Sequence, residues 1–159
     1  MHIRIIAVGK LKERFWREAA QEYLKRLGAF ASVEIIEVAE EKLSENPQPA
    51  EIETSLKKEA ARIVRLIPDK ATVISLAIKG QSFSSKDLAG YIEKLRLGGS
   101  SYLVFMIGGS YGLAEEAYPK PELVLSFSAM TFPHQMMRVV LLEQLYRSFQ
   151  IINKGKYHK

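Results

Sequence analysis

The sequence Leu125-Ser-Phe-Ser-Ala-Met-Thr-Phe-Pro-His134, followed by Gln-Met-Met-Arg-Val-Val-Leu-Leu-Glu-Gln-Leu-Tyr-Arg147, decides the fold of this chain. A short apolar strand gives way to a loop of small polar residues, and a Pro-His pair then begins a helix that is apolar around most of its circumference. The loop has the composition of a buried segment, and the helix lacks the polar face of a solvent-exposed one. The stretch therefore predicts a ligand pocket at the start of the helix and a partner subunit along its side.

Upstream of this stretch, short apolar runs alternate with helical patterns. Strands are expected at Ile3–Val8, Val33–Val38, Ala71–Ile78, Tyr102–Ile107 and Leu123–Phe127. Helices are expected at Glu13–Leu27, Pro49–Ile67, Ser84 or Ser85 to Leu97, and about Pro133 to Asn153, with a short helical piece near Leu113–Tyr118. Strands that alternate with helices predict an α/β fold with a mainly parallel sheet flanked by helices. Residues 1–159 are expected to form a single domain.

The composition is that of an ordinary globular protein, with 47% hydrophobic and 26% charged residues. The longest apolar run, Tyr102–Ile107, is far shorter than the ~20 residues that cross a membrane. The N-terminus reads as a strand and not as a signal peptide, so a cytoplasmic location is expected. The absence of cysteine excludes disulfides, cysteine-based zinc sites and thiol catalysis.

The positive charges are concentrated towards the two ends of the sequence. The net charge is +5, from 23 basic and 18 acidic residues. Basic residues lie at positions 10, 12, 14 and 17 and again at 154, 156 and 159, whereas acids concentrate between Glu34 and Glu59. A charge excess of this size can serve solubility alone, but its segregation favours an anionic partner, with RNA ahead of a membrane surface.

Three predicted strands end in segments suited to ligand contact: Leu76–Gly80, Met106–Gly112 and Phe127–Phe132. In a parallel sheet these ends meet at the carboxyl edge, where α/β folds bind their ligands. Each glycine-containing segment could instead form only a tight strand-to-helix turn. None matches the dinucleotide or phosphate-loop fingerprints. Walls that are apolar and rich in backbone suit a neutral aromatic base and a thioether-like chain better than a polyphosphate.

His134 and Arg138 lie one turn apart on the same helix face, beside the predicted pocket. The positive end of the helix dipole disfavours an imidazolium, so we expect a neutral His134 that can accept a proton. The alternative is a capping or packing histidine. Arg138 could bind a phosphate or pair with a glutamate.

The last helix carries more apolar residues than one core-facing stripe requires. A two-fold homodimer through this helix would supply the second apolar neighbour. The alternative is a helix that is fully buried within one subunit.

Four motifs together resemble one family over the whole chain. They are Val8-Gly-Lys10, Ile107-Gly-Gly-Ser-Tyr-Gly112, the segment Leu125-Ser through Thr131-Phe-Pro-His134 with Arg138 after it, and the terminal Tyr157-His-Lys159. The chain resembles the ribosomal RNA large-subunit methyltransferase H family, which methylates N3 of a pseudouridine and belongs to the SPOUT class. The family tail commonly ends Tyr-His-Arg. Lys159 here keeps the charge but loses the bidentate fork of arginine.

The resemblance implies an α/β SPOUT fold whose C-terminal part is threaded into a trefoil knot, a rare topology. It implies a homodimer that uses S-adenosylmethionine, with no metal, on a pseudouridine in helix 69 of 23S rRNA in the assembled ribosome. Carried over by motif, the cofactor contacts are Leu76, Gly108, Phe127, Ser128, Ala129, Met130, Thr131 and Phe132.

For the reaction, we expect His134 to orient the target base or take its N3 proton, with His158 of the tail as a competing candidate. Arg138 and the basic tail, which the partner subunit could supply, are expected to hold rRNA phosphates. Two other functions are a SPOUT methyltransferase acting on tRNA and a non-enzymatic ribosome-binding factor. A nicotinamide-dependent oxidoreductase ranks third because its fingerprint is missing.

Overall fold

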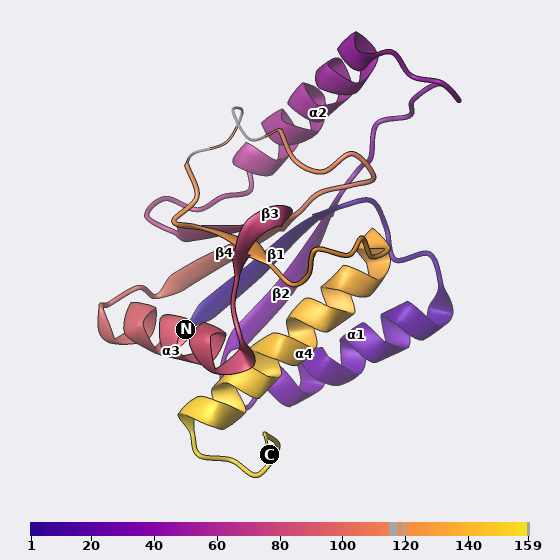
Figure 1. Cartoon of the computed structure of the whole chain (residues 1–159). Coiled ribbons are helices and arrows are strands. Elements are labelled where there is room, and N and C mark those ends of the chain that lie inside the picture. The colour runs from indigo at the N-terminus through magenta and orange to yellow at the C-terminus, as the bar shows by residue number, and fades with distance from the viewer. Residues whose placement is uncertain (115–117, 119, 159) are drawn as a thin grey trace.

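The computed structural model describes residues 1–114, 118 and 120–158 and contains one five-stranded sheet (Figure 1). The strands are β1 (His2–Val8), β2 (Ser32–Val38), β3 (Thr72–Ser82), β4 (Tyr102–Ile107) and β5 (Leu123–Ser126). Their order is β2-β1-β4-β3-β5, and every neighbouring pair is parallel. The helices are α1 (Arg14–Leu27), α2 (Pro49–Val64), α3 (Ser85–Leu97) and α4 (His134–Ile152). The predicted parallel sheet flanked by helices is confirmed.

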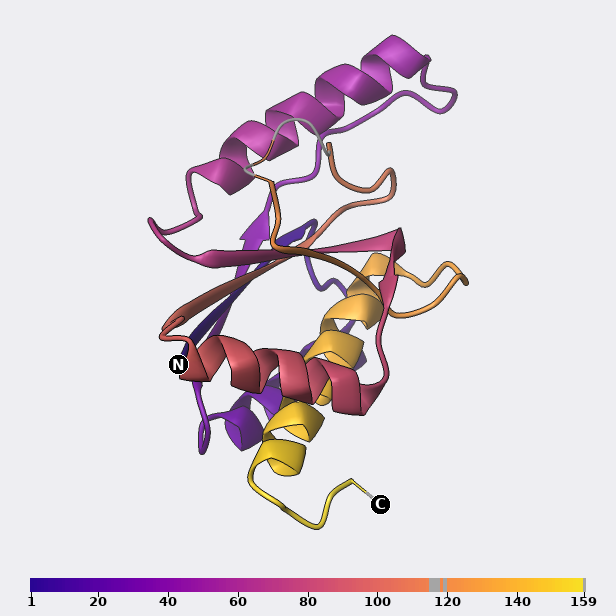
Figure 2. The same ribbon diagram turned by 60° about the vertical axis from the view of Figure 1, so that its left-hand side comes forward.

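The sheet is covered on both faces, as Figure 2 shows. On one side α1, α3 and α4 bury a large apolar cluster that includes Ile5, Phe105 and Leu142. On the other side α2 covers a smaller cluster around Val104 and Ile63. This two-sided burial explains why Tyr102–Ile107 reads as an uninterrupted apolar run: after Tyr102, all of its residues are buried.

Element boundaries follow local signals in the sequence. The helix expected from Ser84 or Ser85 is capped at Ser84, through a reciprocal capping box with Asp87. Pro49 is the first residue of α2, where its missing N–H costs nothing. The helix ends at Val64, before the predicted Ile67, and the chain leaves it through short turns that lead into Pro68. Residues 115–117 of the predicted short helix near Leu113–Tyr118 lie outside the described residues.

Strand β3 is longer than predicted, because it continues through Gly80 to Ser82. Its pairing with β5 shifts register between Leu76 and Gln81, and both residues face Leu125. A Cβ on Gly80 would lie 2.7 Å from the carbonyl oxygen of Val124. Glycine is therefore required here by the close passage of two backbones and not by a turn.

Helix α4 packs against α1 and α3 and buries Leu141, Leu142, Leu145 and Phe149. Its remaining apolar side chains, including Met136, Val139 and Val140, stay half-buried. The alternative of a helix that is fully buried within one subunit is therefore wrong. No helix in the described part of the chain is long and apolar enough to cross a membrane.

Candidate active site

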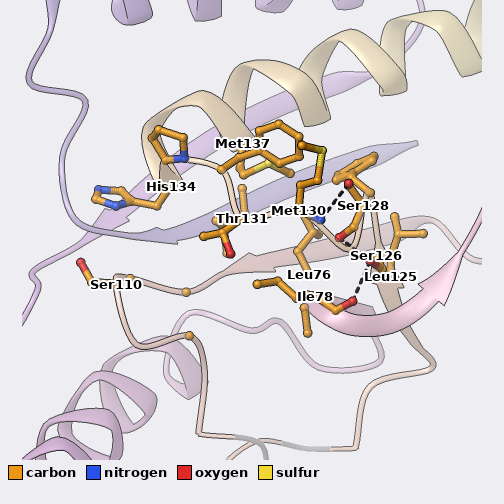
Figure 3. A pocket seen from close by; sticks show the side chains of 18 residues that line it. Leu76, Ile78, Ser110, Leu125, Ser126, Ser128, Met130, Thr131, His134 and Met137 are labelled. Atoms are coloured by element: carbon orange, nitrogen blue, oxygen red, sulfur yellow. Dashed lines mark hydrogen bonds between the residues drawn. The ribbon is translucent and has the colours of Figure 1, made fainter.

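The carboxyl ends of β3, β4 and β5 and the start of α4 enclose a cavity of about 520 Å³ (Figure 3). This volume lies within the range of small-molecule sites. Its walls come from the three predicted strand-end segments together with Pro133, His134 and Met137. Among the predicted cofactor residues, the following line it: Leu76, Gly108, Phe127, Ser128, Met130, Thr131 and Phe132. Ala129 lies within the same loop but is not among the lining residues.

The loop after β5 keeps its shape through its own hydroxyl groups. The Ser126 Oγ lies 2.9 Å from the carbonyl oxygen of Ile78 and 3.1 Å from that of Ser128. The Met130 N–H donates to the Ser128 Oγ over 3.0 Å. These bonds satisfy polar groups of the loop locally, and they tie it to the end of β3.

A tight glycine turn forms the facing wall. A Cβ on Gly108 would lie 2.3 Å from the carbonyl oxygen of Gly112, so only glycine fits. Gly112 has a φ of +82°, and Gly109 and Gly112 form an isolated bridge. The turn leaves its backbone at the cavity surface, where it can approach a ligand closely.

Large apolar side chains are exposed at this site. The exposed fractions are 71% for Met130, 53% for Ile78 and 38% for Phe132. All three line the cavity (Figure 3). Apolar surface of this kind, with a few polar groups at its margin, is typical of a ligand site.

His134 lies at the cavity margin as the first residue of α4. Burial lowers the pKa of its imidazole, Arg138 and Lys12 lower it further, and Glu40 opposes them. The pKa is thus lowered in the direction of the expected neutral form, and burial is the largest cause. The imidazole makes no hydrogen bond within the described part of the chain, and its Nε2 lies 3.3 Å from the position of a Cβ on Gly9.

Arg138 requires a correction, because its side chain is completely buried. Its guanidinium donates to Glu37 over 3.0 Å and to the carbonyl oxygens of Val8 and Gly9 over 2.8 and 2.9 Å. Its Nε is buried without a partner among the described atoms. The expected rRNA phosphate contact is therefore wrong for this conformation, and the alternative of pairing with a glutamate is confirmed.

The structure does not bring His158 to His134 within one chain. The tail folds back at the far end of α4, and the Arg147 guanidinium lies 3.4 Å from the His158 Nδ1. The neighbouring Tyr157 donates to the Glu143 carboxylate over 3.2 Å. Arg147 lies 13 residues after His134, so about 20 Å of helix axis separates His134 from the place where His158 packs. Lys159 lies outside the described residues.

Some lining residues were missed by reading motifs alone. The helical pattern places Met137 on the apolar helix, and the strand pattern places Leu125 and Ser126 before the loop; all three line the cavity. The sequence positions of Met137 and Ser126 nevertheless indicate that they lie near the pocket. Met137 lies one turn after Pro133, and Ser126 is a polar residue at the end of a buried strand. A buried polar residue at a strand end is a candidate for shaping a ligand loop.

A parallel α/β sheet with an apolar cavity at its carboxyl edge defines a class of proteins that bind a small molecule at the strand ends. A family model described as "Predicted SPOUT methyltransferase" matches residues 1–158. The chain therefore belongs to the SPOUT methyltransferase family.

Two individual proteins illustrate the similarity. The chain is 48% identical to the "Ribosomal RNA large subunit methyltransferase H" of Carboxydothermus hydrogenoformans, over the full length of both proteins. A more distant likeness is to the SpoU methyltransferase AviRb from Streptomyces viridochromogenes, solved in complex with AdoMet, at 12% identity. Its TM-score is 0.44, over 98% of this chain and 59% of that one.

Proposed function

We propose that this protein transfers a methyl group from S-adenosylmethionine to large-subunit ribosomal RNA. One observation carries the proposal: in a chain of the SPOUT methyltransferase family, one cavity gathers every predicted cofactor residue except Ala129. The 48% identical relative, named as a ribosomal RNA large-subunit methyltransferase, supports the choice of RNA.

The cavity suits S-adenosylmethionine in its chemistry. Leu76, Phe127 and Phe132 supply apolar walls for an adenine ring, and the backbone around Gly108 supplies hydrogen-bonding groups. The exposed Met130 lies at the same wall. S-adenosylmethionine supplies an electrophilic methyl group. Most of the catalysis left to the protein is positioning of the target atom.

The target atom in the proposal is N3 of a pseudouridine in helix 69 of 23S rRNA. This position carries an imide proton that has to leave. The neutral, half-buried His134 at the cavity margin is placed to orient the base or to accept that proton. A positioned base of this kind typically contributes about 10²–10⁴-fold.

We propose the assembled ribosome as substrate and the cytoplasm as the location. The described residues form a single sheet with its covering helices and no separate RNA-binding unit. A net charge of +5 is small for holding free RNA. A surface that exists only in the assembled ribosome would supply the missing specificity.

We also propose a homodimer through α4. The half-buried Met136, Val139 and Val140 form an apolar face that α1 and α3 leave partly uncovered. Because each chain folds its own tail at the far end of α4, a tail histidine at the site would have to be His158 of the partner subunit. Sedimentation at micromolar concentration tests the dimer.

The proposed fold includes a trefoil knot in the C-terminal part. Two features support a chain threaded close to earlier backbone in this region. Gly80 lies against the backbone of β5, and the loop that follows β5 is bonded to Ile78. Such threading would hold the three cavity segments together without a separate domain.

The experiment that tests the function is transfer of labelled methyl from S-adenosylmethionine to ribosomes that lack this modification. Ribosomes without the pseudouridine, separated subunits, free rRNA and tRNA run in parallel. We expect incorporation only into intact ribosomes that carry pseudouridine. Incorporation into tRNA alone would show that the substrate is tRNA and not ribosomal RNA. Failure to bind S-adenosylmethionine in calorimetry would favour a non-enzymatic ribosome-binding factor.

A further inference from the structure

The loop that joins β1 to α1, residues 9–13, carries two exposed lysines beside the candidate active site. The side chains of Lys10 and Lys12 make no hydrogen bond or ion pair within the described part of the chain. Glu13 is the one acidic residue of the loop. The loop therefore presents two ammonium groups to solvent, against one carboxylate of its own.

This loop is held rigidly by its backbone. The Gly9 N–H donates to the Val38 carbonyl over 2.8 Å, and the Leu11 N–H donates to the Glu37 carboxylate over 2.8 Å. Leu11 itself is buried in the main apolar cluster. Arg17 donates to the carbonyl oxygens of Leu11 and Lys12. A loop with this many fixed backbone groups loses little conformational entropy when its side chains bind a partner.

The buried Arg138 stabilises the start of the loop through hydrogen bonds. It donates to the carbonyl oxygens of Val8 and Gly9 at the end of β1, and the same Glu37 oxygen accepts from both Arg138 and Leu11. The ion pair thus joins α4, β2 and the loop. Arg138 therefore has a structural role next to the site: it holds the backbone carbonyls of Val8 and Gly9 in place.

The loop is also fixed next to the cavity. The Lys12 N–H donates to the side-chain oxygen of Gln135 over 2.8 Å, and Gln135 follows the cavity-lining His134. The His134 Nε2 lies 3.3 Å from the position of a Cβ on Gly9. Lys12 is close enough to His134 to affect its charge state. The ammonium groups of Lys10 and Lys12 therefore stand on the segment that borders the cavity at His134.

We propose that Lys10 and Lys12 bind the phosphodiester backbone of the RNA next to the base that enters the cavity. The proposal rests on the proposed function, since it names the protein surface that positions that substrate. Phosphate contacts fix the register and orientation of the RNA without reading its sequence. Such contacts suit this loop, because Lys12 is bonded to Gln135, the residue that follows His134. Each contact releases counterions and adds to the salt dependence of binding.

The test compares wild type with the double variant Lys10→Ala/Lys12→Ala on intact ribosomes. We expect KM to rise about tenfold while kcat stays within about twofold, because the contacts position the substrate and do not touch the reacting atoms. The logarithm of kcat/KM should depend less steeply on the logarithm of salt concentration, with a slope smaller by about 1.5 to 2. S-adenosylmethionine affinity in calorimetry should not change.

The matched control is Lys25→Ala/Lys94→Ala, which removes the same charge from exposed positions in the last turns of α1 and α3. An unchanged KM in the loop variant, or an equal rise in the control, would overturn the proposal. A direct binding measurement on ribosomes at two salt concentrations runs beside the kinetics. If wild type binds ribosomes through the two lysines but transfers no methyl, the proposed reaction fails and the loop assignment stands.

Discussion

The two ends of α4 differ in how far their polar groups are satisfied. At the first end, His134 has no hydrogen-bond partner among the described residues, and the apolar side chains of Met130 and Phe132 lie exposed beside it. From the middle of α4 onwards, the Glu143 carboxylate accepts hydrogen bonds from Arg147 and from the Tyr157 hydroxyl, and we call this half of the helix, with its folded-back tail, the closed end. We expect the start of the helix at His134 to contact ligands and the closed end to serve stability.

The closed end is reinforced by ring contacts. Tyr157 packs edge-on against Tyr146 with ring centroids 4.8 Å apart, and the Arg147 guanidinium lies 4.8 Å from the Tyr157 ring centroid. These contacts fold the tail onto its own helix. The comparison predicts that loss of the unbonded His134 imidazole reduces activity at little cost in stability, whereas loss of the bonded tail groups costs stability and leaves activity in place.

The largest effect is expected for His134→Ala. Methyl transfer to ribosomes should fall about 10²–10⁴-fold if the imidazole accepts the N3 proton. The free energy of unfolding should change by only about 1 kcal/mol, because the ring is half-exposed and unbonded. Single-turnover rates and urea titrations measure the two quantities. Near-normal turnover with intact cofactor binding would remove His134 from the mechanism.

Arg138→Met is expected to be the most destabilising change on α4. It removes the guanidinium that donates to the Glu37 carboxylate and to the carbonyl oxygens of Val8 and Gly9, and among the described residues it leaves Glu37 with only the Leu11 N–H. Breaking a buried pair on one side costs about 3 kcal/mol, at the low end of the usual range because Glu37 is partly exposed. Urea denaturation measures the loss. Arg138→Lys is the control and should recover part of it; equal stability of all three proteins would show that the network contributes nothing.

The pH dependence of the rate tests the charge state of His134. Burial holds the pKa of this imidazole below its usual value of 6.5, so the neutral form persists to lower pH than in a free histidine. The single-turnover rate should fall up to about tenfold per pH unit only below that lowered pKa. His134→Ala should lack this acidic limb. An unchanged limb in the variant would assign the titration to another group.

The smallest effect is expected for Tyr157→Phe at the closed end. It removes the hydroxyl that donates to Glu143 but keeps the ring contacts with Tyr146 and Arg147. The loss of stability should be about 1 kcal/mol. Because the tail of each chain lies far from its own cavity, S-adenosylmethionine affinity should not change. A large loss of cofactor affinity would contradict the separation of the two ends.

The sequence predicts the fold well because its strands and helices have clear periods and boundary residues. The run Tyr102–Ile107 forms the expected strand, and the helix expected from Ser84 or Ser85 follows a cap at Ser84. The extension of β3 through Gly80 cannot be predicted, since it depends on the shifted register in which β3 pairs with β5. Local signals describe one segment at a time and contain no information about that pairing.

The candidate site also has features that the sequence predicts and features that it does not. The loop Phe127–Phe132 and the turn at Gly108 could be located from strand ends and glycine alone. The fate of Arg138 could not be predicted, because its partners Val8, Gly9 and Glu37 are distant in sequence. Helical spacing predicts that Arg138 and His134 share a face. It does not predict that Arg138 is buried while His134 stays partly exposed.

The sheet order has a consequence for how the chain folds during synthesis. β4 is paired on both sides, and residue 2 of β1 is paired with residue 102 of β4. Until β4 leaves the ribosome, β1 and β2 can form only a two-stranded parallel pair, in which the edge of β1 that later pairs with β4 is open. Long-range parallel pairing of this kind is intrinsically slow, so folding should become cooperative only after about two thirds of the chain has been made.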